Sequence, residues 1–345
     1  EDGIRDTSVT GVQTCALPIF VCGGIIMKKI GIIGCGRQAP KHIMGYFENG
    51  IKDIFLFDVI ESRARDLAEE YNLQYKKIDD LVAIPDVGIY SICTPPNTHD
   101  TLIETLINNN KHILCEKPLS LNLDNLSKFE RLSTEKGLTV MGGYIYKFSP
   151  SHIEMREFIE ANQNHIQSAY LRIASPGLNN AWQFSKNKGG GAINELFVHM
   201  IDLANWYFGP IENIEEIDIQ TYRSDRESVM DKNDHLAEDF ITVKILNRLG
   251  FSITIEADMI SNDFVQYVNI SGPGLMGFCS IQPNLPLILR QSEKKYDICE
   301  YREFKNLHTS QIAYFLSCID KITTHSQSTI AESIDICKFL NEVTD

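Results

Sequence analysis

Two charged residues at the end of an apolar run are the first candidates for chemistry. Glu116 and Lys117 follow the run Ile113–Cys115, and Pro118 ends the extended segment directly after the lysine. Ligands of open α/β sheets bind at the carboxyl ends of the strands. The position therefore places two charges where a functional site is expected.

A second candidate is a polar stripe on an otherwise apolar helix. Three glycines precede a predicted helix over 192–208, on which Glu195, His199 and Asp202 stand at i, i+4 and i+7, on one face. Burying three ionisable groups is costly unless they pair or face a polar cavity. Three interpretations stay open: a satisfied core network, a metal site lacking another clear ligand cluster, or an acid/base histidine oriented by a carboxylate.

A glycine-rich turn points to a dinucleotide. Gly34, Gly36, Arg37, Gln38 and Ala39 fit the pattern G-x-G-x-x-A directly after an apolar strand, which brings backbone N–H groups to a pyrophosphate. About 20 residues further on stands Asp58, where a carboxylate can bind a ribose 2′-OH. The carboxylate would repel a 2′-phosphate, so NAD is favoured over NADP. The alternative is that Asp58 only caps the following turn.

A third loop at the same predicted edge offers further cofactor contacts. Thr94 and Asn97 provide hydrogen bonds, and two prolines stiffen the backbone between them. The alternative is a rigid turn that starts a helix at Thr98 or His99. The residues predicted to bind the cofactor in this loop are Thr94, Pro95, Pro96, Asn97 and His99.

These residues must be positioned by two kinds of element. From residue 27 to 148, apolar runs at 29–33, 54–57, 89–93, 112–115 and 139–144 alternate with amphipathic stretches, which predicts a doubly wound parallel sheet. From 149 to 345, alternating strands at 169–174, 214–222, 240–245, 251–257, 265–271 and 278–282 predict an α+β domain with a mainly antiparallel sheet. Turns are expected at 247–250 and 272–274, and a capping box at Thr329 and Glu332 begins the last of two closing helices.

Composition limits the class of protein. The 345 residues carry a formal net charge of -14, which argues against a nucleic-acid partner or an anionic membrane surface, and no apolar run is long enough to span a bilayer. The nine cysteines show neither a Cys-x-x-Cys pair nor zinc spacing, so a reduced, cytoplasmic setting without a metal is expected. Residues 1–26 contain VTGVQTCALPI, which looks like a translated sequencing adapter. We expect this leader to be non-native and without function; its charge and short apolar region argue against a signal peptide.

The motifs taken together resemble one family. The order GIIGCGRQA, CTPPNTH, CEKP, GGYIYKFSP and KGGGAINELFVHMID is similar to the Gfo/Idh/MocA family of glucose–fructose oxidoreductases and inositol 2-dehydrogenases, from Met27 onward. The resemblance implies a Rossmann domain, a C-terminal domain on an open sheet whose final helices pack back on the first domain, and oxidation or reduction of a sugar, cyclitol or nucleotide sugar with NAD(P).

The resemblance also implies roles for single residues. Lys117 would position the reacting hydroxyl and stabilise developing oxyanion charge, and His199 would be the general acid/base. Glu195 would be the carboxylate neighbour of His199, and Asp202 would hold the histidine or the substrate. The same cleft would contain Tyr146, Lys147 and the nicotinamide-side Trp182. Glu116 is a cofactor-binding candidate with Lys117, and two roles stay open for it: it orients the lysine or it touches the cofactor. Three positions depart from the family pattern: Glu195 replaces Asp, Phe197 replaces Gly, and Gln183 replaces Arg.

The predicted function is NAD-dependent hydride transfer from a secondary alcohol of a small polyol or sugar. Two alternatives are elimination or glycosidic cleavage through transient oxidation, and a non-catalytic NAD-binding regulator. An open sheet face in the second domain favours a homo-oligomer, a dimer or a tetramer.

Overall fold

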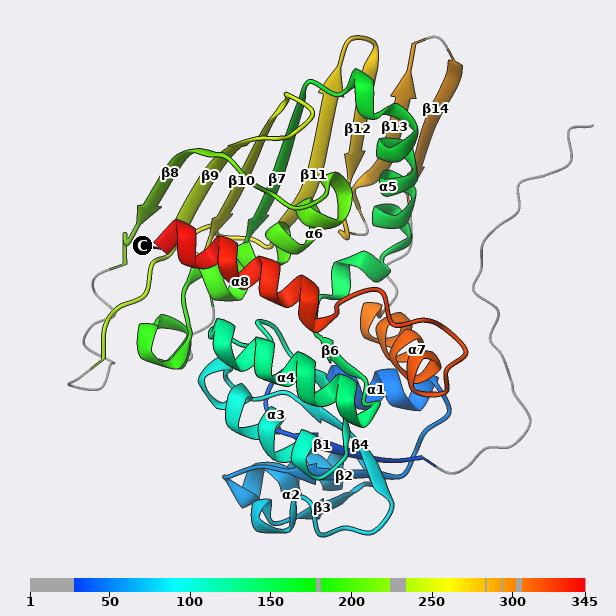
Figure 1. Cartoon of the computed structure of the whole chain (residues 1–345), viewed down its shortest axis with the longest axis vertical. Coiled ribbons are helices and arrows are strands. Elements are labelled where there is room, and N and C mark those ends of the chain that lie inside the picture. The colour runs from blue at the N-terminus through cyan, green and yellow to red at the C-terminus, as the bar shows by residue number, and fades with distance from the viewer. Residues whose placement is uncertain are drawn as a thin grey trace, which may run out of the picture.

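The chain folds around two β-sheets, which occupy the lower and upper parts of Figure 1. The structure, a computed structural model, describes residues 28–177, 181–223, 234–282, 284–292, 294–301 and 306–344. The predicted leader 1–26 lies outside the described residues. Among those residues, no helix has the length and apolar character needed to cross a membrane.

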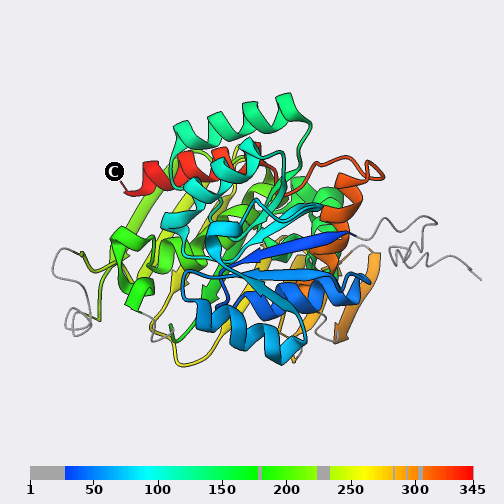
Figure 2. The same ribbon diagram turned by 90° about the horizontal axis from the view of Figure 1, so that it is seen from below.

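The first sheet has six parallel strands in the order β3-β2-β1-β4-β5-β6, which is the Rossmann order. Apart from the edge strand β3, its strands are short, mostly apolar runs that are largely buried, as is typical of parallel sheets. Helices α1 and α2 cover one face and α3 and α4 the other (Figure 2). The elements are β1 (Lys29–Ile33), α1 (Ala39–Glu48), β2 (Ile54–Phe57), α2 (Glu61–Tyr71), β3 (Gln74–Lys76), β4 (Val87–Ile92), α3 (His99–Asn108), β5 (His112–Cys115), α4 (Leu123–Lys136) and β6 (Val140–Gly142). Hydropathy did not predict β3, because this edge strand is exposed along its whole length.

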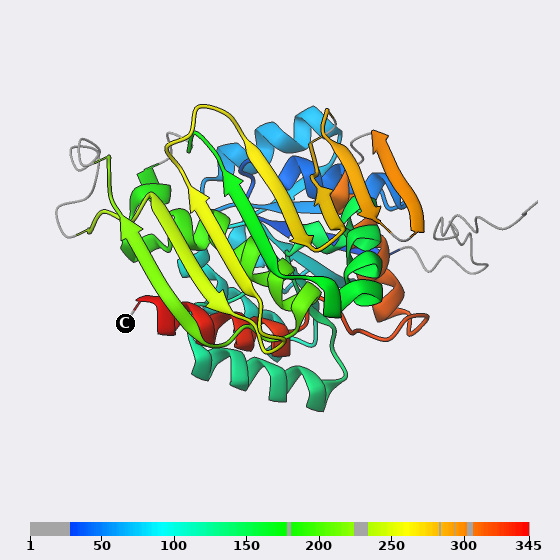
Figure 3. The same cartoon turned by 90° about the horizontal axis from the view of Figure 1, so that it is seen from above.

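The second sheet has eight strands in the order β14-β13-β12-β11-β7-β10-β9-β8. Every pair is antiparallel except β7 and β10, which run parallel. Helices α5 (Pro150–Asn162) and α6 (Val198–Phe208) pack on one face (Figure 3). The strands are β7 (Ser168–Ala174), β8 (Ile214–Gln220), β9 (Phe240–Leu246), β10 (Ser252–Asp258), β11 (Val265–Gly272), β12 (Leu275–Cys279), β13 (Pro286–Gln291) and β14 (Lys294–Tyr301).

The sequence prediction of this sheet needs two corrections. The strand expected at 278–282 begins earlier, because the turn at 272–274 is tight enough for Leu275 to pair with Gly272. Strands β13 and β14 were not predicted. The turn at 247–250 is confirmed by the bond from Gly250 N–H to the Asn247 carbonyl (2.8 Å).

The last two helices lie against both parts of the fold. Helix α7 (Leu307–Ile319) packs on α1, and α8 (Ile330–Thr344) packs on both α4 and α6. The predicted capping box is present: Thr329 N–H donates to Glu332 Oε2 (2.9 Å) and Glu332 N–H donates to Thr329 Oγ1 (3.1 Å). This segment therefore fixes the functional edge of the first sheet relative to helix α6.

The helix predicted over 192–208 is not a continuous α-helix. A π-helical turn, Ile193–Phe197, precedes α6, and Glu238 Oε1 accepts the Ile193 N–H at 2.9 Å. A π-turn takes more residues per turn than an α-turn, so side chains before and after it are out of α-helical register. This changes which side chains Glu195 and His199 can reach.

Candidate active site

Three loops meet at the carboxyl ends of β1, β4 and β5, on both sides of the point where the strand order reverses. The glycine turn follows β1, the Thr94 loop follows β4, and Glu116 and Lys117 follow β5. Gly34 has φ +88°, and a Cβ there would stand 2.7 Å from Thr94 Cγ2, so glycine is required. In such sheets this crevice is the ligand site.

The glycine turn fits a dinucleotide. A Cβ added at Gly36 would meet no atom within 4 Å, so the backbone there faces open space. Among the residues that the structure describes, no side chain caps the N-terminus of α1, and the buried Oε1 of Gln38 has no hydrogen-bond partner. Free N–H groups at a helix N-terminus suit phosphate oxygens. The residues present therefore fit the phosphates of NAD(P), with Arg37 exposed and Ala39 buried beside them.

Asp58 stands at the end of β2 as expected, and both carboxylate oxygens accept backbone N–H groups. Oδ2 accepts from Cys35 (2.8 Å) and Oδ1 from Ile60 (2.7 Å). The capping alternative is therefore observed, because Asp58 ties the strand end to the glycine turn. Val59 and Ile60, the two residues after Asp58, are 82% and 44% exposed, so the side chains directly beyond the carboxylate are apolar.

The Thr94 loop contains one residue whose predicted role must be revised. His99 is fully buried, and its Nδ1 and Nε2 lie 2.8 Å from the Pro118 carbonyl and 2.9 Å from the Thr94 carbonyl. The ring joins the loops after β4 and β5 and has no surface left for a cofactor. Thr94 Oγ1 accepts a hydrogen bond from Thr98 (2.7 Å). Pro95 is half-buried, Pro96 is buried and Asn97 is exposed.

Lys117 is held by the π-turn. Its Nζ donates to the Glu195 carbonyl at 2.8 Å and lies 3.4 Å from Glu195 Oε1. Gln183 Nε2 donates to Glu195 Oε2 (3.0 Å), while the buried Gln183 Oε1 has no hydrogen-bond partner within the described part of the chain. Glu195 therefore contacts Lys117 and Gln183 and makes no hydrogen bond to His199, contrary to the role implied by the sequence. The reason is the π-turn, which shifts Glu195 out of the expected register.

His199 is buried beside these groups. Its ring centroid lies 4.7 Å from that of Tyr146, and its Nδ1 has no hydrogen-bond partner among the described atoms. Burial, and then the charge of Lys117, lowers the pKa of His199 well below its ordinary value. The imidazole is therefore neutral at physiological pH and keeps a lone pair available for a proton.

Lys147 and Asp202 make different contacts from those that the family resemblance implied. Lys147 Nζ lies 2.9 Å from Asp202 Oδ1 and 2.9 Å from Glu332 Oε1, and the lysine side chain is 1% exposed. Burial by itself lowers the pKa of Lys147, but the two carboxylates raise it above its ordinary value. Asp202 thus pairs with Lys147 rather than with His199, and the triad joins α6, the short helix Ile145–Phe148 and α8.

The structure also shows how far Phe197 and Trp182 are buried. Phe197 is fully buried in the core beneath the second sheet, so its ring fills protein interior rather than a substrate pocket. Trp182 is half-buried in the short helix Ala181–Phe184.

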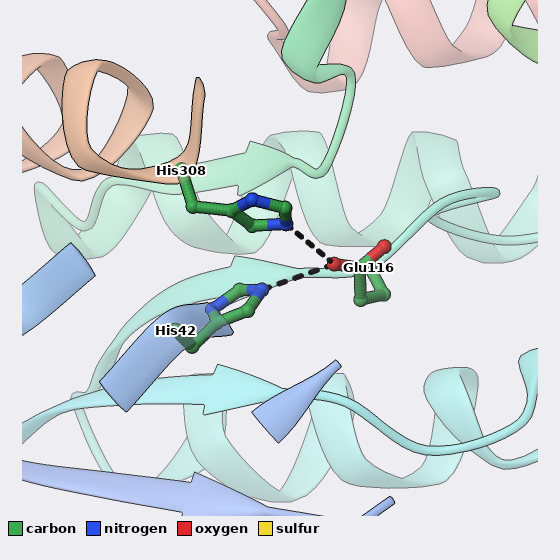
Figure 4. A group of neighbouring side chains, drawn as sticks. All are labelled: His42, Glu116 and His308. Atoms are coloured by element: carbon green, nitrogen blue, oxygen red, sulfur yellow. Dashed lines mark hydrogen bonds and ion pairs between the residues drawn. The ribbon is translucent and has the colours of Figure 1, made fainter. Parts of the chain in front are cut away.

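The structure adds two residues that the sequence analysis missed, His42 and His308. Figure 4 shows both rings directed at one oxygen of Glu116. His42 lies close to the glycine turn and could have been noticed there. His308 is far away in sequence and carried no signal.

Comparison with known proteins identifies the family to which this fold belongs. The model of an oxidoreductase family with an NAD-binding Rossmann fold, Gfo/Idh/MocA, matches residues 28–144, and the model of the Gfo/Idh/MocA C-terminal domain matches residues 155–272. Myo-inositol 2-dehydrogenase of Thermotoga maritima is 27% identical over 197 residues, which are 55% of this chain and 57% of that protein. The chain thus spans about half the length of the curated relatives it matches.

Solved structures share the whole fold. GenD2 from gentamicin A biosynthesis, in complex with NAD, has a TM-score of 0.75 at 17% identity, over 93% of this chain and 95% of that one. KijD10, a 3-ketoreductase from Actinomadura kijaniata in complex with NADP and TDP-benzene, has a TM-score of 0.77 at 16% identity, over 92% and 96%. The two family models together cover most of the described residues, and this chain belongs to the Gfo/Idh/MocA oxidoreductase family.

Proposed function

We propose that this chain is an NAD-dependent dehydrogenase that acts on a secondary alcohol of a sugar, cyclitol or related polyol. The observation that carries the proposal is the buried His199, whose Nδ1 has no hydrogen-bond partner among the described atoms, near the ammonium group of Lys117. A base without a proton and a fixed positive charge are the two groups that alcohol oxidation needs. NAD, when bound, accepts or donates the hydride.

The residues of the chain provide proton transfer, charge stabilisation and substrate binding. The neutral imidazole of His199 takes the hydroxyl proton, and Lys117 stabilises negative charge on the substrate oxygen. Glu195 keeps Lys117 in place through its backbone and side-chain oxygens. The unpartnered Oε1 of Gln183 accepts a hydrogen bond from a further substrate hydroxyl, which suits a polyol.

NAD is proposed over NADP because of the surface that follows β2. Asp58 places a carboxylate there, and the exposed Val59 and Ile60 bring no cation toward a 2′-phosphate. An apolar surface of this kind suits an adenosine without additional charge.

The test is a screen of NAD reduction over sugars, cyclitols and nucleotide sugars, followed by two variants. Lys117→Ala and His199→Ala are expected to lower kcat by at least about 100-fold, a typical loss for groups that transfer a proton or stabilise an oxyanion, while NAD still binds in calorimetry. Lys52→Ala, an exposed lysine, is the matched control.

Two outcomes would overturn the proposal. Turnover retained in both variants would remove these residues from the chemistry. Product release without net NADH formation would instead support elimination or cleavage through transient oxidation.

A further inference from the structure

A second cluster of chemically competent side chains shares Glu116 with the sheet edge described above, and the proposed reaction gives none of its three residues a role. His42 from α1, Glu116 after β5 and His308 near the start of α7 meet in the interior (Figure 4). His42 Nε2 lies 3.0 Å and His308 Nε2 lies 3.9 Å from the same oxygen, Glu116 Oε1. All three residues are buried, and their ligand atoms lie within 4.8 Å of one another.

Both imidazoles are fixed by hydrogen bonds at their other nitrogen. His42 Nδ1 lies 3.1 Å from Ser91 Oγ, and His308 Nδ1 lies 3.2 Å from Asn306 Oδ1. Oxygen partners of this kind orient the histidine ligands of metals, with the other ring nitrogen directed at the ion. His42 Nε2 hydrogen-bonds to Glu116 Oε1 in this structure, so an ion bound here would replace the proton on that nitrogen.

The tautomer of His308 follows from its partner. Asn306 Oδ1 also accepts the His308 backbone N–H (3.2 Å), which identifies that atom as the amide oxygen. An amide oxygen only accepts, so Nδ1 of a neutral His308 carries the hydrogen and Nε2 carries a lone pair. This lone pair faces a carboxylate oxygen across 3.9 Å, a distance too long for a hydrogen bond. Two electron-rich atoms directed at each other across such a gap are the arrangement that a cation stabilises.

We propose that His42, Glu116 and His308 bind a divalent transition metal ion, with zinc as the best match. Two imidazoles and one carboxylate are a common zinc ligand set, with a fourth position left for water. With bonds of about 2.1 Å, tetrahedral ligand atoms stand about 3.4 Å apart. The observed separations of 3.0 and 3.9 Å lie on either side of that value, so small rotations of the Glu116 carboxylate and the rings complete the geometry.

The charges nearby set the strength of the site. Glu116 is its single carboxylate, and the ammonium groups of Lys41 and Lys117 act on the same region. We therefore expect binding in the micromolar range rather than the much tighter binding of structural zinc sites.

The test measures metal binding directly, so it does not depend on the proposed dehydrogenase activity. The full chain is stripped with a chelator, and Co²⁺ is followed by its visible d–d absorption while Zn²⁺ is followed by calorimetry. One equivalent is expected to bind. His308→Gln should weaken binding at least about tenfold, as the loss of a ligand or its orienting partner does. His165→Gln, which changes an exposed histidine, should bind as the unmodified chain does.

Each remaining outcome is decisive. Absence of Co²⁺ and Zn²⁺ binding, or unchanged affinity in His308→Gln, overturns the proposal and leaves a proton-linked His–Glu–His network. If circular dichroism shows that His308→Gln is unfolded, His308→Cys replaces it. A thiolate-to-cobalt charge-transfer band in His308→Cys supports the site, and its absence rejects it.

Discussion

Replacing Lys147 by methionine is expected to destabilise the fold while leaving the chemistry of the cleft in place. The side chain is 1% exposed and bridges Asp202 and Glu332 at 2.9 Å each. At an effective dielectric of about 20, attraction to Asp202 alone amounts to about 6 kcal/mol, most of which offsets the desolvation of the two charges. Lys147→Met leaves Asp202 buried without its partner, and such a loss typically lowers the free energy of unfolding by about 3–5 kcal/mol.

The assay is urea unfolding of the full chain, followed by circular dichroism. Lys338→Met is the control, because Lys338 forms an exposed pair with Asp335 at 3.6 Å. A pair of that kind contributes at most about 1 kcal/mol. The double variant Lys147→Met/Asp202→Leu removes both buried charges and should be more stable than Lys147→Met alone.

Two results would refute the reasoning. If Lys147→Met unfolds like the unmodified chain but raises the KM of the substrate found in the screen, then Lys147 faces substrate, as the sequence implied. The single variant Asp202→Leu is measured as well. If the loss of stability in the double variant equals the sum of the losses in Lys147→Met and Asp202→Leu, Lys147 and Asp202 are not energetically coupled.

Three further predictions concern pH, cofactor and turn geometry. Burial lowers the pKa of His152 to about 4, so the ring stabilises the fold above the unfolded pKa of about 6.5 and this contribution is lost as pH falls toward 4. When the pH falls from about 7.5 to about 5, the free energy of unfolding of the unmodified chain should decrease by about 2 kcal/mol more than that of His152→Gln, as measured by urea unfolding. Equal decreases would contradict a lowered pKa of His152. Gly36→Ala should change the free energy of unfolding by no more than about 0.5 kcal/mol, because the added Cβ meets no protein atom within 4 Å. It should weaken NAD binding at least about tenfold in calorimetry, and an unchanged affinity would place the phosphates elsewhere. Asp58→Ala should lose about 1–2 kcal/mol of stability, because the Cys35 and Ile60 N–H groups lose the carboxylate that accepts their hydrogen bonds. It should also reduce the preference for NAD over NADP in paired KM measurements, and an unaltered preference would exclude Asp58 from ribose recognition.

The sequence by itself determined the parts whose signals are local. Apolar runs of strand length with helices between them predicted the parallel sheet. Gly34 and Gly36 matched the pattern of a dinucleotide-binding turn, and the structure has Gly34 at φ +88° and open space beside Gly36. Glu116 and Lys117 were placed at the correct edge because a strand end is visible as a change from apolar to charged residues. The family could be recognised because these motifs have a fixed order.

Tertiary structure alone decided which charged groups meet. Spacing put Glu195, His199 and Asp202 on one helix face, and the family resemblance assigned both carboxylates to His199. In the structure Glu195 in the π-turn contacts Lys117, and the buried Lys147 pairs with Asp202 and with Glu332 from the last helix. His308 lies near Glu116 only because α7, which follows the last strand of the second sheet in sequence, packs on α1 of the first domain. Pairing of buried charges depends on contacts between residues far apart in sequence, and periodicity within one element does not contain that information.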